Sequence, residues 1–289
     1  MPEVRSQKLK VFIMPKYAII NQKRYLPDGR CLYRIVAKRD FGTIKAGTVG
    51  GFIEDTCNLS QSGDCWVGEK AAVYGNARVT KNAVVRGHAV LRDYAIATDD
   101  AVVEGRALLD QHAFVCDHAY VGNSTYLSGC ATVGGYARLY CYGYRSKSGK
   151  TLMPNVGGLA RIKDHAFLEG RVSIRDHAVL AGHCKIIGRV RIIEHSLIGD
   201  EAEIRGHVLV SGTAHVIQNA CICDRSVITG NALVCGETIL GGKSLVTCNV
   251  IVKINGRIDN VMFSGDQYVT SRDGYLHFST SRWRENATA

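Results

Sequence analysis

The chain repeats every six residues over most of its length. Residues 73–93, VYGNARVTKNAVVRGHAVLRD, have aliphatic side chains at Val73, Val79, Val85 and Leu91, each followed four places later by a small residue. A helix repeats its buried positions every 3.6 residues and a strand every 2, so a period of six fits neither alone. It is typical of a short strand, a tight turn and another strand, as in the stacked coils of a parallel β-helix.

The hexads can be followed through two long runs. Twelve hexads run from Val67 to Arg138, and fifteen more run from Val156 to Leu245. The first position is Val, Leu or Ile in all of them except one, where it is Ala97, and the fifth position is small or medium-sized throughout. The third position is Gly in fourteen hexads, Asp in seven and Asn in one, and these residue types tolerate positive φ at a tight corner. The pattern therefore predicts both the buried slots and the corners.

With these hexads the chain resembles the hexapeptide-repeat proteins. The resemblance implies an all-β fold, a left-handed parallel β-helix with three faces and three hexads to a coil, here of about ten coils. Further upstream, residues 39–71, RDFGTIKAGTVGGFIEDTCNLSQSGDCWVGEKA, are similar to the enterobacterial YdcK-type proteins, which are described as acetyltransferases and are otherwise uncharacterised.

The pattern divides the chain into three parts. Residues 1–48 are predicted to form an N-terminal β cap with a turn at LPDGR, residues 26–30, and residues 49–249 to form the β-helix. Residues 250–289 are predicted to form a C-terminal hairpin cap, with its turn at Asp273 and Gly274. Residues 145–155, RSKSGKTLMPN, cannot fill the aliphatic slots and are expected to leave the rod as a loop.

Composition excludes several classes of protein. No run approaches the ~18 apolar residues of a membrane span, and the apolar segment at the start is too short for a signal peptide, so we expect a cytoplasmic protein without a membrane partner. The eleven cysteines are scattered among core slots such as Cys65 and Cys184, which indicates packing and not a metal or disulfide framework.

The net charge of +10 is concentrated at the N-terminal end. Residues 1–45 hold eleven Lys or Arg against Glu3, Asp28 and Asp40. An anionic partner and a charged cap that discourages strand addition both fit this excess, and the cap is favoured. Nucleic acid is not expected, because no stacking pattern of aromatic and basic residues accompanies the charge.

Histidine favours one position of the repeat. Eight of the ten histidines occupy fourth positions, namely His88, His112, His118, His165, His177, His183, His195 and His207. A stride of 18 residues places His165 beneath His183, and His177 beneath His195. Most are interpreted as corner residues, and two imidazoles are too few ligands for a metal site, so no metal is expected.

The segment GYRSKSGKT, residues 143–151, looks like a phosphate-binding P-loop but has one residue too many between its glycines, and no helix follows it. What remains is an accessible loop with Arg145, Lys147 and Lys150, which could hold the phosphates of an acyl carrier or be merely solvated.

The resemblance to hexapeptide-repeat transferases implies an acyltransferase that uses acetyl-CoA and a small amine or hydroxyl acceptor, and is a homotrimer with sites between rods. Under that hypothesis His165, which follows the loop, is the candidate general base, and Arg145, Lys147 and Lys150 are the candidate cofactor contacts. The alternative is a non-catalytic β-solenoid scaffold or binding protein, which the regularity of the repeat favours. The residues alone do not decide whether the protein is an enzyme.

Overall fold

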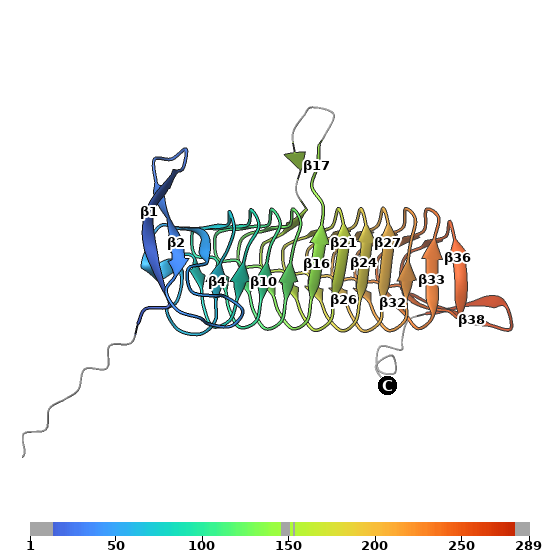
Figure 1. The fold of residues 1–289 in the computed structure, drawn as a ribbon. Helices are drawn as coiled ribbons and strands as arrows, with labels where there is room; N and C mark the ends of the chain where they lie inside the picture. The colour runs from blue at the N-terminus through green and yellow to red at the C-terminus, as the bar shows by residue number, and fades with distance from the viewer. Residues whose placement is uncertain (1–13, 146–150, 153, 281–289) are drawn as a thin grey trace, which may run out of the picture.

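The chain winds into a long rod of stacked coils (Figure 1). The computed structural model describes residues 14–145, 151–152 and 154–280. In Figure 1 the chain advances from left to right while the front strands run upward, which makes the coils left-handed. The predicted class, an all-β, left-handed parallel β-helix with three faces, is confirmed.

Three sheets form the three faces, and we number them in the order in which each coil visits them. Sheet 1 has 14 strands: β1 (Tyr17–Tyr25), β2 (Cys31–Ala37), β3 (Val49–Ile53), β5 (Ala72–Val73), β8 (Val90–Leu91), β11 (Leu108–Leu109), β14 (Tyr126–Leu127), β19 (Asn155–Val156), β22 (Ser173–Ile174), β25 (Arg191–Ile192), β28 (Leu209–Val210), β31 (Val227–Ile228), β34 (Leu245–Val246) and β37 (Met262–Phe263).

Sheet 2 has 12 strands: β6 (Arg78–Val79), β9 (Ile96–Ala97), β12 (Phe114–Val115), β15 (Thr132–Val133), β20 (Arg161–Ile162), β23 (Val179–Leu180), β26 (Leu197–Ile198), β29 (His215–Val216), β32 (Leu233–Cys235), β35 (Ile251–Lys253), β38 (Gln267–Arg272) and β39 (Tyr275–Thr280). Sheet 3 has 11 strands: β4 (Trp66–Val67), β7 (Val84–Val85), β10 (Val102–Val103), β13 (Tyr120–Val121), β16 (Arg138–Cys141), β21 (Phe167–Gly170), β24 (Lys185–Gly188), β27 (Glu203–Gly206), β30 (Cys221–Ile222), β33 (Thr238–Gly241) and β36 (Gly256–Asp259).

The coils number about 12, against the expected count of about ten. They continue beyond residue 249, where β36 pairs with β33 and β37 pairs with β34. The hexad pattern fades there because the slots are filled irregularly, for example by Phe263, which is buried. No helix among the described residues could span a membrane, the one helical element being η1 (Thr56–Asn58).

The core consists of ladders of like side chains. Val85, Val103 and Val121 are fully buried in consecutive coils, and their strands pair in parallel with no register shift. Each buried aliphatic side chain contributes about 1.5–3 kcal/mol relative to exposure. The fifth-position residues, such as Ala83, lie beside these ladders and are equally buried.

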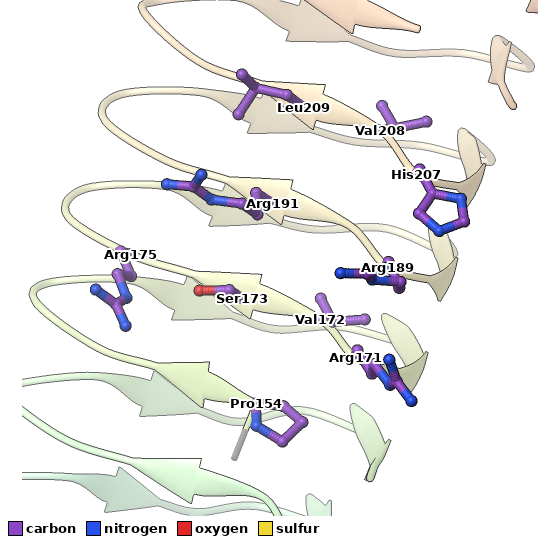
Figure 2. Close-up of a pocket in the computed structure, with 10 residues that line it drawn as sticks. All are labelled: Pro154, Arg171, Val172, Ser173, Arg175, Arg189, Arg191, His207, Val208 and Leu209. Carbon is purple, nitrogen blue, oxygen red and sulfur yellow. The ribbon is translucent and has the colours of Figure 1, made fainter. Parts of the chain in front are cut away.

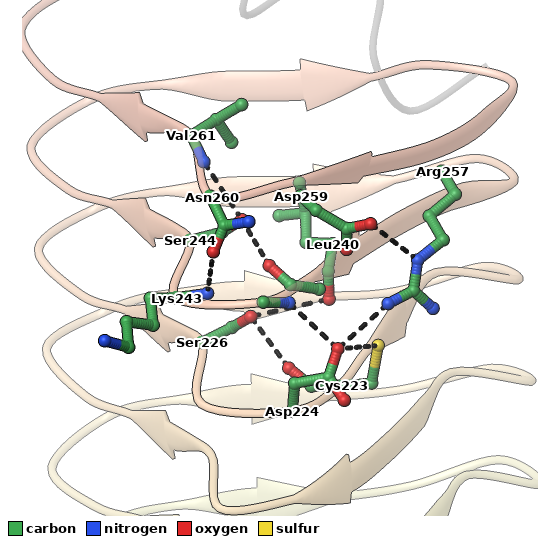
Figure 3. Close-up of polar contacts among 12 residues, drawn as sticks. Cys223, Asp224, Ser226, Leu240, Lys243, Ser244, Arg257, Asp259, Asn260 and Val261 are labelled. Carbon is green, nitrogen blue, oxygen red and sulfur yellow. Dashed lines mark hydrogen bonds and ion pairs between the residues drawn. The ribbon is translucent and has the colours of Figure 1, made fainter.

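Aspartate at the third position has two roles in the corner. Asp224 has φ 61°, and its carboxylate accepts a hydrogen bond of 2.9 Å from the backbone N–H of Gly242, one coil further on (Figure 3). This bond holds the pKa of Asp224 below its usual value. Asp164 caps Gly182 in the same way at 3.0 Å. Aspartate therefore adopts the left-handed backbone conformation of the turn, and its carboxylate links neighbouring coils by a hydrogen bond.

Both ends of the rod carry antiparallel hairpins. β1 and β2 are joined through the predicted turn at LPDGR, and β38 pairs with β39 across Asp273 and Gly274. Lys16 is almost fully buried beneath the N-terminal hairpin, and its Nζ donates to the carbonyl oxygen of Cys65 at 3.0 Å. The division into residues 1–48, 49–249 and 250–289 remains a prediction.

The basic residues of the N-terminal hairpin pack on aromatic rings. The guanidinium groups of Arg24 and Arg34 lie over Phe52 at 5.7 and 5.2 Å from the ring centroid, and that of Arg30 lies over Tyr74 at 5.2 Å. These contacts use the positive charge within the cap, in line with the interpretation favoured from the sequence.

We expect Ala83→Leu to lower the free energy of unfolding by about 1–3 kcal/mol, because the larger side chain overpacks a slot closed by neighbouring coils. The matched control is Val84→Leu, one residue along, whose side chain is only partly buried on the outer face of sheet 3. Chemical denaturation of both variants tests this, and equal stabilities would contradict the register described here.

Candidate functional site

The rod is interrupted at one corner by an extruded ribbon. β17 (Tyr144–Arg145) pairs with β18 (Thr151–Leu152) in an antiparallel arrangement, and the pair projects from the rod between β16 and β19 (Figure 1). The ribbon therefore leaves where sheet 3 passes into sheet 1, which we call the 3/1 corner. Lys147 and Lys150 lie outside the described residues, and for Arg145 only the backbone is described.

A groove lies at the foot of this ribbon, toward the C-terminal end of the rod (Figure 2). It has a volume of about 500 Å³ and is lined by Pro154, Arg171, Val172, Ser173, Arg175, Arg189, Arg191, His207, Val208 and Leu209. Four of these residues are arginines and none is acidic. The groove therefore presents a strongly positive surface.

Two rows of side chains line the groove. Arg171, Arg189 and His207 follow one another along the 3/1 corner, and each backbone N–H bonds to the next coil at 2.6 Å. Arg175 and Arg191 project from the outer face of sheet 1 (Figure 2). Among the described residues no ion pair joins Arg175, Arg189 or Arg191 to a carboxylate, so their charges are available to an anionic ligand.

The turns under the groove differ from those at the other corners. β21, β24 and β27 each run for four residues and end at Gly170, Gly188 and Gly206, with φ of 102°, 112° and 90°. Aspartates at third positions elsewhere have φ of 55–62°, as in Asp200 and Asp176. Only glycine adopts the wider angles without strain, which gives this part of the corner its own shape.

His165 lies at a different corner, between β20 and β21, where sheet 2 passes into sheet 3 (the 2/3 corner). Its exposed ring stacks on Tyr136 at 5.1 Å and on His183 at 4.4 Å between centroids. The predicted stacking of His165 beneath His183 is therefore observed, as is that of His177 beneath His195 at 4.6 Å. Within one chain the structure does not bring His165 to the groove.

Buried thiols offer no nucleophile. Cys141 and Cys184 are fully buried, and burial raises the pKa of each thiol to about 12. Their side chains fill apolar slots, as the sequence indicated, and remain protonated at neutral pH. Catalysis by the groove would therefore depend on histidine as the proton acceptor, and His207 is the histidine in its lining.

Sequence reasoning missed the arginines of the groove. The sequence does contain a signal for them, because the fourth position is basic or His at five successive steps of 18 residues: Arg171, Arg189, His207, Arg225 and Lys243.

The fold and repeat define a hexapeptide-repeat β-solenoid. A curated relative is the uncharacterized acetyltransferase YdcK of Escherichia coli K12, which is 35% identical over 81 residues, 23% of this chain. The chain spans 25% of the length of this relative. No family model matches the sequence.

Two solved structures of LpxA proteins are similar to this chain. LpxA from Acinetobacter baumannii is 15% identical, with 72% of this chain and 73% of that chain covered and a TM-score of 0.35. The UDP-N-acetylglucosamine O-acyltransferase LpxA from Moraxella catarrhalis is 14% identical, with 69% and 73% covered and a TM-score of 0.29.

Proposed function

We propose that the protein is an acyltransferase that takes an acetyl group from acetyl-CoA and transfers it to an amine or hydroxyl. The observation that carries the proposal is the basic groove at the foot of the extruded ribbon. Phosphate groups of a CoA-type donor would bind Arg189 and Arg191 through charge-assisted hydrogen bonds, and Arg145, Lys147 and Lys150 are proposed as further phosphate contacts. The partial likeness to the acetyltransferase YdcK supports the same reaction class.

The chemistry requires a proton acceptor beside the thioester. The acceptor oxygen or nitrogen attacks the thioester carbonyl, and its proton passes to the imidazole of His165. The carbon–sulfur bond then breaks, and the CoA thiolate leaves and takes up the proton.

His165 and the groove lie on different corners, so a site that uses both must be shared between two rods. This requirement supports the proposal of a homotrimer, in which each of three equivalent contacts pairs one protomer's 2/3 corner with its neighbour's groove. Sedimentation velocity tests the assembly, and a strict monomer at working concentration would contradict a shared site.

Calorimetric titration with acetyl-CoA tests the donor site without knowledge of the acceptor. We expect Arg189→Ala/Arg191→Ala to bind about tenfold or more weakly, because each charge-assisted bond to phosphate contributes about 1.5–3 kcal/mol. The triple Ala variant of Arg145, Lys147 and Lys150 should also bind more weakly.

The matched control is Arg161→Ala/Lys163→Ala, which removes two exposed charges beside sheet 2 and should bind like wild type. Absence of any heat at millimolar acetyl-CoA would favour the second candidate, a non-catalytic scaffold. The evenness of the coils supports that candidate, since in the described part of sheets 1 to 3 every core strand from β7 to β35 pairs in parallel on both sides.

A further inference from the structure

The basic residues of the groove belong to a much longer series. The 3/1 corner has one fourth-position residue in each coil, and consecutive ones are stacked by backbone hydrogen bonds, as from Arg189 N–H to the carbonyl of Gly206. Before the ribbon this series contains Lys70, His88 and Arg106. After the ribbon it contains Arg171, Arg189, His207, Arg225 and Lys243. Six of the ten members from Lys70 to Lys243 are Lys or Arg, and the other four in the described coils are His88, Ser124, Tyr142 and His207.

The other two corners have no such series. Where sheet 1 passes into sheet 2, the fourth positions from Asn76 to Asn249 hold no Lys, Arg, Asp or Glu in the described coils. At the 2/3 corner they hold no Lys or Arg, and they include Asp64, Asp100, Glu201 and Glu237. The fourth position of the hexad therefore does not by itself select basic residues, because the same position holds different charges at the three corners.

The basic corner is not neutralised by its own neighbours. Glu104 and Asp224, on the sheet 3 side, are paired with Arg86 and Arg257. No ion pair within the described residues involves Lys70, Arg106, Arg189, Arg225 or Lys243, all of which are exposed. Like charges thus recur at intervals of one to three strand spacings of ~4.8 Å, and their repulsion is relieved by a ligand with a row of negative charges.

An aliphatic strip lies beside the basic corner on the outer face of sheet 1, in two stretches that are separated by Asn155, Ser173 and Arg191. Val90 pairs with Leu108 in adjacent coils, and Leu209 pairs with Val227 and Val227 with Leu245. All are only partly buried. A ligand on this corner therefore meets cations along one side and aliphatic groups along the other.

We infer that the 3/1 corner binds a linear acidic polysaccharide that lies along the rod, which in the proposed trimer would occupy the cleft between this corner and the neighbouring rod. We call the fourth-position residues of the 3/1 corner its rungs. A sugar unit in an extended chain advances by a length close to the strand spacing, so carboxylates of the sugar units could face the basic rungs. The apolar faces of the rings would pack on the aliphatic strip. Single-stranded nucleic acid fits less well, because its binding relies on aromatic platforms and Tyr142 is the one aromatic residue in the series.

The ten rungs from Lys70 to Lys243 extend over roughly 45 Å, so affinity should depend on ligand length. We expect a decamer of galacturonic acid to bind at least tenfold more tightly than a dimer, and neutral dextran not to bind. Fluorescence anisotropy of labelled oligomers, without acetyl-CoA, measures this independently of any transferase activity.

The decisive variant is Arg106→Ala/Arg225→Ala, whose residues flank the ribbon and lie outside the groove lining. It should weaken decamer binding about tenfold and flatten the salt dependence, while Arg161→Ala/Lys163→Ala should stay within about twofold of wild type. Thermal melting of both variants should match wild type, since all four side chains are exposed.

Two outcomes would overturn the inference. Equal affinity for dimer and decamer, with no effect of Arg106→Ala/Arg225→Ala, would restrict binding to the groove. Tighter binding of a ten-nucleotide single-stranded DNA than of the decamer would assign the corner to nucleic acid.

Discussion

The His165→Ala variant should transfer the acyl group about a hundredfold more slowly than wild-type protein, since a positioned general base contributes about 10²–10⁴-fold. Its affinity for acetyl-CoA should not change, because His165 and the groove lie at different corners of the chain. The transfer rate is measured as release of the CoA thiol. The assay uses a panel of amino and hydroxyl acceptors, and also water. Calorimetry provides the affinity.

A shared site makes a second measurement possible. Protein carrying His165→Ala keeps an intact groove, and protein carrying Arg189→Ala/Arg191→Ala keeps an intact His165. When equal amounts are dissociated and reassembled together, about a quarter of all sites should contain both wild-type parts. The mixture should therefore regain about a quarter of wild-type activity, although each variant alone is slow.

His207→Ala is the comparison that can contradict this arrangement. His207 lines the groove of its own rod and should affect transfer only a few-fold under the shared-site proposal. A hundredfold loss with His207→Ala, together with normal transfer by His165→Ala, would place the reaction within one rod and assign the base to His207.

Gly188→Ala should lower the free energy of unfolding by about 3 kcal/mol. Gly188 has φ 112°, and a Cβ there would lie 2.7 Å from the carbonyl oxygen of Gly206, in the next coil. Backbone conformations that L-residues avoid cost about 1–3 kcal/mol, and here the clash is added to that strain. Relief would require the coils to separate at the turn that carries Arg189. Chemical denaturation measures the loss.

Gly199→Ala is the matched control, because Gly199 has no positive φ and its added Cβ would meet only the Ile217 side chain at 3.5 Å. We expect a change of less than about 0.5 kcal/mol for this surface-type substitution. Similar stabilities for Gly188→Ala and Gly199→Ala would mean that the wide turn below the groove is described wrongly.

The hexad alone determined the architecture, because the requirement to bury the first and fifth side chains of every six residues is local and recurs in every coil. It identified the slots of Val85 and Ala83, the left-handed corner at Asp164, and the stacking of His165 beneath His183. Each depends only on position within the repeat. Where irregular side chains such as Phe263 fill the slots, the signal weakens, and for that reason the coil count was underestimated.

Only the tertiary structure decided which corner each rung occupies. The three faces have the same hexad, so periodicity does not show which corner of the coils before the ribbon continues into the corner of Arg171. The ribbon adds residues that are not a multiple of the repeat, so Arg106 and Arg171 cannot be aligned by counting. Parallel pairing of β16 with β21, on either side of the ribbon, restores the register and places both residues on one basic corner. Burial is encoded residue by residue, whereas the alignment of surface charge depends on which strands pair across the insertion.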